Sequence, residues 1–190
     1  MKTKRRKIFI LFVLYLVLSA LLLALPTVAA ETADDEVVPC DVECYVISDD
    51  PAGVKVRSGP GEEYPVIATL STESIVTVSL QITGTSGEWL RVTDLYVVKE
   101  SATDGYEKML DITGWVTGPV LGVRAWPLEA PLVPLYEEQN TTSPVLTRLP
   151  RDAGVAVIGC NGDWLKVNYK GIEGWLAPGT YCGAAFTNCI

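Results

Sequence analysis

Residues 54–67 read VKVRSGPGEEYPVI, and a shift of 79 positions places them on residues 133–146, which read VPLYEEQNTTSPVL. Seven positions match in register at this shift: Val54, Val56, Pro65, Val66, Leu70, Val76 and Val78 lie on Val133, Leu135, Pro144, Val145, Leu149, Val155 and Val157. The similarity resumes in two shorter motifs: GEWLRV at 87–92 over GDWLKV at 162–167, and GWV at 114–116 over GWL at 174–176. Because solenoid repeats are only about 20 to 50 residues long, this longer period indicates a duplicated domain.

The local pattern of the repeat is that of β-strands. Apolar and polar residues alternate over residues 74–83, as in a strand with one buried face. Gly and Pro recur about every 8 to 12 residues, which is typical of small barrels and sandwiches, and no helical periodicity of useful length follows Leu25. The pair Asn161-Gly162 predicts a two-residue hairpin in the second unit, whereas residues 84–87 predict a longer turn in the first. We therefore expect an all-β fold.

The stretch at 54–67, together with the motifs at 87–92 and 113–116, resembles the bacterial SH3-like (SH3b) domain family. The resemblance covers most of residues 44–121 and, in a divergent form, residues 131–181. It implies two tandem SH3-like β-barrels of five or six strands each. Trp89 and Trp164, which each follow a turn and open a strand, are expected to supply much of the buried apolar area of these small cores.

Five segments are predicted along the chain. They are a signal peptide or N-terminal anchor at 1–30, an acidic leader at 31–40, a first barrel at 41–121 with a long hairpin insertion at 93–112, a second barrel at 122–183 and a C-terminal tail at 184–190.

The N-terminal segment predicts export. Five basic residues among the first seven precede an apolar run at 8–25, and small residues at 28–30 offer a cleavage site. About 18 apolar residues can also span a bilayer, so an uncleaved anchor is the alternative. Either interpretation places residues 31–190 in the cell envelope or outside the cell, with membrane contact only through this segment.

The exported part is strongly acidic. Residues 1–30 hold five of the 15 basic residues and none of the 23 acidic ones, so residues 31–190 carry a net charge of −13. Binding to nucleic acid needs a basic stripe, and the remaining Lys and Arg residues are scattered singly. We predict no nucleic-acid partner, and we interpret the negative charge as a source of solubility.

The composition also argues against catalysis. The chain has no histidine, so it has neither a Ser-His-Asp nor a Cys-His nucleophile pair, and a structural zinc site is improbable. The paired carboxylates at 49–50, 62–63 and 137–138 are interpreted as solvated charge rather than acid-base groups. We predict no catalytic residues, no metal and no cofactor.

The leading functional hypothesis is a non-catalytic exported binding module, whose ligand the resemblance suggests is a cell-wall peptide or an extracytoplasmic protein segment. SH3-type grooves hold extended peptides on aromatic surfaces. The candidate ligand-binding residues lie in the first unit: Arg57, Tyr64, Tyr96, Tyr106 and Trp115. For Trp115 a role in the core is the stronger alternative. The second unit lacks this set, because Arg57, Gly59, Pro60 and Tyr64 are replaced by Tyr136, Glu138, Gln139 and Ser143.

A second hypothesis is a structural or assembly protein that pairs with an envelope partner through the hairpin at 93–112. A small hydrolase is the weakest of the three classes, and a zymogram on cell-wall material tests it.

Cysteines in an exported chain are candidates for disulfides. There are five of them: Cys40, Cys44, Cys160, Cys182 and Cys189. Cys160 shares an apolar outer strand face with Ala156 and Ile158, and such a face must be covered. We therefore predict a bond from Cys160 to a tail cysteine, Cys182 or Cys189, with Cys40 and Cys44 as the second pair.

Overall fold

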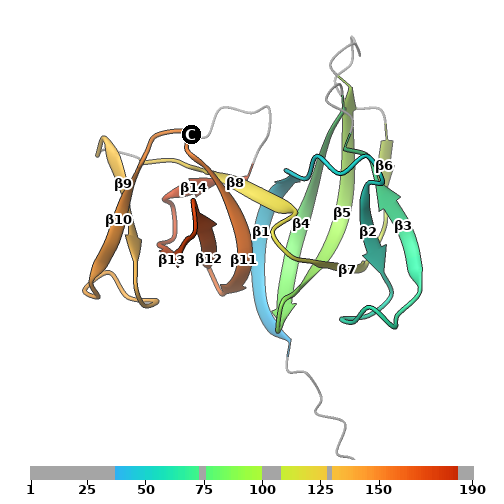
Figure 1. Cartoon of the computed structure of the whole chain (residues 1–190), viewed down its shortest axis with the longest axis horizontal. Helices are drawn as coiled ribbons and strands as arrows, with labels where there is room; N and C mark the ends of the chain where they lie inside the picture. Colours follow the sequence, from blue (N-terminus) through green and yellow to red (C-terminus); the bar gives the residue numbers. More distant parts are fainter. Residues whose placement is uncertain (1–36, 73–75, 100–107, 128–129, 184–190) are drawn as a thin grey trace, which may run out of the picture. The chain divides into compact units, whose positions relative to one another are not determined.

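The computed structural model describes residues 37–72, 76–99, 108–127 and 130–183. The predicted signal or anchor at 1–30 and the tail at 184–190 lie outside these ranges. Over the described ranges the regular structure consists of strands, which confirms the all-β prediction (Figure 1). Within them, no helix is long and apolar enough to cross a membrane.

The strands form one sheet. Their bounds are β1 (Val38–Val46), β2 (Val54–Arg57), β3 (Val66–Leu70), β4 (Val76–Ser86), β5 (Trp89–Lys99), β6 (Lys108–Leu110), β7 (Gly114–Thr117), β8 (Leu121–Ala125), β9 (Leu132–Tyr136), β10 (Val145–Pro150), β11 (Gly154–Asn161), β12 (Trp164–Tyr169), β13 (Ile172–Leu176) and β14 (Tyr181–Cys182). β1 begins inside the segment predicted as the acidic leader.

Two halves of this sheet have the same order of pairing. The first unit, β1 to β7, runs β3-β2-β7-β5-β4-β1, and the second unit, β8 to β14, runs β10-β9-β13-β12-β11-β8. The registers also agree. Val54 pairs with Leu70 in the first unit, and the equivalent Val133 pairs with Leu149 in the second. Likewise, Arg57 pairs with Trp115, and the equivalent Tyr136 pairs with Trp175. The sequence repeat is therefore accompanied by a repeat of strand pairing.

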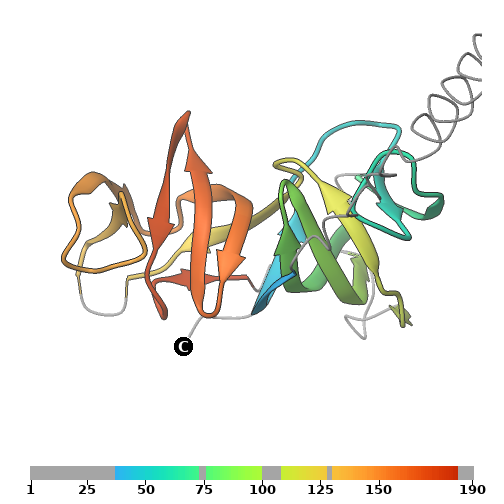
Figure 2. The same cartoon turned by 90° about the horizontal axis from the view of Figure 1, so that it is seen from below.

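Strand β8 joins the two units. It pairs with β1 of the first unit and with β11 and β14 of the second (Figures 1 and 2). In the second unit β8 occupies the position that β1 occupies in the first. Each lies next to the first strand of the central hairpin, which is β4–β5 in the first unit and β11–β12 in the second. The expectation of two separate closed barrels is corrected here, because the described strands form one continuous sheet that is not closed into a barrel.

The core follows the predicted alternation on the central strands. Val78, Leu80 and Ile82 are buried on one face of β4, as expected from the period-two pattern. On β5 and β12, however, the core positions are Leu90 and Leu165, which are fully buried. Trp89 and Trp164 precede them and are only half-buried. The expected core role of the two tryptophans is wrong, because adjacent residues of a strand point to opposite faces.

The central hairpin is the same in both units. Asn161 pairs with Trp164, which confirms the predicted hairpin, and the two residues between them form its loop. Ser86 pairs with Trp89 in the first unit, so the longer turn predicted there is wrong. Gly87 and Gly162 both have φ near +55°, a backbone conformation that glycine adopts without strain.

The glycine of each Gly-Trp motif is required by close packing. A Cβ added at Gly114 would lie 2.8 Å from the carbonyl oxygen of Arg57 and 3.0 Å from Cδ1 of Ile67. At Gly174 the corresponding distances are 2.7 Å to the carbonyl oxygen of Tyr136 and 3.1 Å to Cδ1 of Leu146. Both glycines therefore allow β7 or β13 to approach the neighbouring strand.

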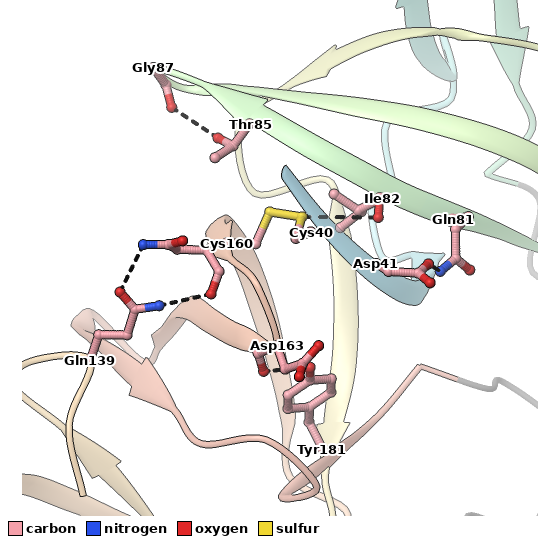
Figure 3. The surroundings of a disulfide bond; sticks show 11 residues. Cys40, Asp41, Gln81, Ile82, Thr85, Gly87, Gln139, Cys160, Asp163 and Tyr181 are labelled. Carbon is pink, nitrogen blue, oxygen red and sulfur yellow. Dashed lines mark hydrogen bonds between the residues drawn. A yellow bond between two sulfur atoms is a disulfide. The ribbon is translucent and has the colours of Figure 1, made fainter. Parts of the chain in front are cut away.

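A disulfide connects the units at their junction. Cys40 of β1 is bonded to Cys160 of β11 across a sequence separation of 120 residues (Figure 3). The predicted pairing of Cys160 with the tail, and of Cys40 with Cys44, is wrong. Cys40 and Cys44 lie four residues apart on one strand, so their Cα atoms are about 13 Å apart, and a disulfide needs less than about 7 Å. β11 also contacts β1, β4 and β5 of the first unit.

The remaining cysteines differ in state. Cys44 is a free thiol, fully buried, and burial together with the nearby Glu43 carboxylate raises its pKa well above the ordinary value. Cys182 is disulfide-bonded. Cys189, the other cysteine of the C-terminal segment, lies outside the described residues.

Candidate functional site

The candidate site of the first unit is the loop between β2 and β3. Three backbone hydrogen bonds fold it: Ser58 N–H to Pro65 O (3.0 Å), Gly61 N–H to Gly59 O (3.0 Å) and Tyr64 N–H to Gly61 O (3.2 Å). A Cβ at Gly59 would collide with the ring of Tyr64, so this ring packs directly over the glycine backbone. Tyr64 is nevertheless 40% exposed. The loop therefore presents one aromatic ring in a defined position.

Arg57 connects this loop to a groove. Its Nη1 donates a hydrogen bond of 2.8 Å to the carbonyl oxygen of Tyr64. Arg57 also lines a groove of about 250 Å³, together with Lys55 of the same strand and Glu62 of the loop. Since a guanidinium has five N–H donors, one bond to the loop leaves donors for a ligand carboxylate or carbonyl. Arg57 thus bonds to the backbone of the loop that carries the exposed Tyr64 ring, and it also lines the groove.

The other predicted ligand residues are distributed differently. Trp115 pairs with Arg57 across β7 and β2, so it belongs to the same region, but it is only 9% exposed. Tyr96 is exposed on β5, within the predicted hairpin insertion at 93–112, and it pairs with Met109 of β6. Tyr106 lies outside the described residues. The structure therefore brings Arg57, Tyr64 and Trp115 together, and it places Tyr96 on a separate element.

The equivalent loop of the second unit has the same backbone. Its three hydrogen bonds, each displaced by 79 residues, are Glu137 N–H to Pro144 O (2.9 Å), Asn140 N–H to Glu138 O (2.7 Å) and Ser143 N–H to Asn140 O (3.1 Å). Its side chains are engaged within the unit. Ser143 Oγ bonds to the backbone of Glu138, and Gln139 exchanges two hydrogen bonds with Asn161 of the central hairpin (Figure 3). This loop is therefore bound to its own domain.

An aromatic group in the second unit was not singled out by the sequence analysis. Tyr136 and Trp164 contact each other edge to face, with ring centroids 6.0 Å apart. Trp175 pairs with Tyr136 across β13 and β9, and all three side chains are half-buried. The signal was present in the sequence, because Tyr136 replaces Arg57 in a repeat that keeps both tryptophans.

The paired carboxylates either take part in local hydrogen bonds or are exposed to solvent. Asp50 accepts a hydrogen bond from the Ala52 N–H through its side chain and one from the Thr72 hydroxyl through its carbonyl oxygen. Glu137 and Glu138 are exposed. Over the described ranges, no group of three or more Cys, Asp or Glu residues is placed to hold a metal ion.

In comparisons with known proteins, the second unit matches the model of one family. Residues 132–181 match the model of the bacterial SH3 domain. This range is the unit that the sequence analysis described as divergent. Curated proteins give no match. Among solved structures, the chain is similar to the one titled "Structure of NlpC2 from Trichomonas vaginalis", at 12% sequence identity and a TM-score of 0.28. That alignment covers 75% of this chain and 48% of the other, so the similarity spans about half of the other protein's length.

Proposed function

We propose that the protein is an exported, non-catalytic binding module built from two bacterial SH3-like domains, and that the first domain recognises an extended peptide of the cell wall or of an extracytoplasmic protein. The family match of the second unit supports this class. The shared strand order and the three equivalent loop hydrogen bonds support the extension of the class to the first unit.

The observation that carries the proposed site is the hydrogen bond from Arg57 to the carbonyl oxygen of Tyr64. It links the guanidinium at the groove to the loop that carries the exposed Tyr64 ring. Arg and Tyr are the residue types that most often dominate binding energy at interfaces. Arg57 would hold a carboxylate or carbonyl of the ligand, and Tyr64 would pack against its chain.

Export is supported by the bonded cysteines. Cys40, Cys160 and Cys182 are all in disulfides, and disulfides persist in oxidising compartments rather than in the cytosol. Together with the predicted signal or anchor at 1–30, this favours the cell envelope or the extracellular space as the place of action.

Sedimentation with insoluble peptidoglycan, compared with capture from a soluble protein extract, tests the proposal. The protein would be residues 31–190, which contain the compact unit Asp35–Ile190. Tyr64→Ala should weaken binding at least about tenfold, because loss of an interface aromatic typically costs more than about 1.4 kcal/mol. The matched control is Tyr96→Ala, a tyrosine of similar exposure on the β5–β6 arm.

The same pair of variants separates the proposal from its alternative. If Tyr96→Ala abolishes capture of a protein partner while Tyr64→Ala does not, the hairpin arm is the contact surface and the protein is an assembly element. Clearing of a peptidoglycan zymogram by residues 31–190 would contradict the non-catalytic assignment.

A further inference from the structure

A second groove, of about 350 Å³, lies between the two units. One side is made by two turns of the first unit, Gly87-Glu88 at the tip of the central hairpin and Gly118-Pro119 between β7 and β8. The other side is the outer face of β11 to β13 in the second unit. Ligand pockets typically measure about 300 to 1,000 Å³ and occur preferentially where domains meet. This groove has both properties.

The two sides are held together by covalent and backbone bonds. β8 pairs with β1 and β11 at once, and the Cys40–Cys160 disulfide joins β1 to β11 near the hairpin end (Figure 3). Gly162 N–H also donates a hydrogen bond of 3.0 Å to Pro39 O. These bonds fix the two sides of the groove relative to each other, and such preorganisation lowers the cost of binding.

The groove offers one apolar contact and charges of both signs. Ile158 of β11 is half-buried in it, and Lys166 and Asn168 of β12 stand beside it. Glu88 and Glu173 supply carboxylates from the two opposite sides. In the described part of the chain, no hydrogen bond or ion pair engages the side chains of Lys166, Glu88 or Glu173. Their charges are available to a ligand.

We propose that this groove binds a short peptide that carries both a free amine and a free carboxylate. The ligand carboxylate would lie against the Lys166 ammonium, its amine against Glu88 and Glu173, and an apolar side chain on Ile158. Asn168 would bond to the peptide backbone. A groove lined by an ammonium group and by carboxylates selects a ligand that carries both a negative and a positive group.

The test uses the tripeptide Ala-Leu-Ala with free termini, titrated into isotope-labelled residues 31–190 and followed by amide chemical shifts. At millimolar peptide we expect saturable shifts at Gly87, Ile158, Lys166 and Asn168. The same peptide with an acetylated amino terminus and an amidated carboxyl terminus should bind at least about tenfold more weakly. No shifts at these residues with the free tripeptide, or equal affinity for the blocked one, would overturn the proposal.

Two variants make the test specific. Lys166→Gln should reduce the affinity for the free tripeptide at least about tenfold, whereas Lys170→Gln should leave it unchanged. Lys170 is the matched control because it is exposed, lies on the same unit outside the groove and stands 5.1 Å from the ring of Tyr169. Equal effects of the two variants would contradict the assignment.

The proposal is independent of the site at Tyr64. Tyr64→Ala should leave the tripeptide shifts intact, and Lys166→Gln should leave peptidoglycan sedimentation intact. Failure of one experiment therefore does not decide the other.

Discussion

The loops at 57–65 and 136–144 have the same backbone hydrogen bonds and opposite side-chain behaviour. In the first unit Arg57 supports the loop from outside and Tyr64 remains exposed. In the second unit Ser143 bonds back onto the loop and Gln139 ties it to Asn161. The same backbone path therefore leaves an aromatic ring exposed in the first unit and ties the loop side chains back to the domain in the second.

The two units also differ in how they begin. The first unit begins with β1, which starts near the end of the predicted leader, whereas the second begins with β8, which both units share. A cut between the units at residues 121–125 would remove a strand from the junction. Separate expression of the halves is thus a weaker test than single substitutions in the whole exported chain.

The largest effect is expected from the bond between the units. Cys160→Ser should lower the free energy of unfolding by about 5 kcal/mol, because the disulfide closes a loop of 120 residues in the unfolded chain. Denaturant unfolding without reductant measures this loss, and two resolved transitions in the variant would show that the units then unfold separately. Cys40→Ser, which removes the other half of the same disulfide, should show the same loss. Peptide mapping without reduction that found Cys160 bonded to Cys182 would contradict the connectivity.

The core leucines test whether the two units depend on equivalent positions. Leu90→Ala and Leu165→Ala should each cost about 3 kcal/mol, since both side chains are fully buried. Arg91→Ala and Lys166→Ala, on the opposite face of the same strands, should stay within about 0.5 kcal/mol of the parent. A clear inequality between the two leucine variants would show that the units contribute unequally to stability.

The glycines of the Gly-Trp motifs should behave alike. Gly114→Ala and Gly174→Ala are each expected to cost about 2 kcal/mol, because the new methyl group meets a backbone carbonyl and an apolar side chain. Gly154→Ala is the control, since a Cβ there meets nothing within 4 Å. Thermal unfolding of the three variants is the measurement, and a neutral Gly114→Ala would mean that the first unit tolerates a wider separation of β7 and β2.

The smallest effect concerns a tyrosine at the junction. The Tyr181 hydroxyl donates a hydrogen bond of 2.8 Å to Asp163 O (Figure 3). Burial, with the carboxylates of Asp163 and Asp41, raises the pKa of Tyr181 to about 12 from an ordinary value of 10.0. Tyr181 in the unfolded chain then ionises first, so its contribution to stability is constant below about pH 10 and falls as the pH rises towards 12.

Tyr181→Phe should therefore show a smaller loss of stability over this alkaline range, after a cost of about 1 kcal/mol at neutral pH from the lost hydrogen bond. Denaturant midpoints of the parent and the variant at several pH values provide the comparison. Identical alkaline slopes would contradict a role for Tyr181.

The sequence predicted the elements that depend on neighbours along the chain. The alternation in β4 predicted its buried face, the Asn-Gly pair predicted the central hairpin of the second unit, and the repeat predicted equivalent loops. It misjudged Trp89 and Trp164, because their spacing identified the start of a strand but not the face that packs inward. It could not predict the partner of Gln139, which is 22 residues away in Asn161.

Local chemistry by itself determined the strands, the Asn161-Gly162 turn and the duplicated loop, since alternation and turn residues act over a few positions. Tertiary structure alone decided that β8 joins the two units into one sheet and that Cys160 bonds to Cys40. Both depend on contacts between segments that are distant along the chain, and no local pattern specifies which strand lies beside another. Cys40 and Cys44 are close in sequence, yet the extended strand between them separates them, and only the assembled sheet brings Cys40 to Cys160.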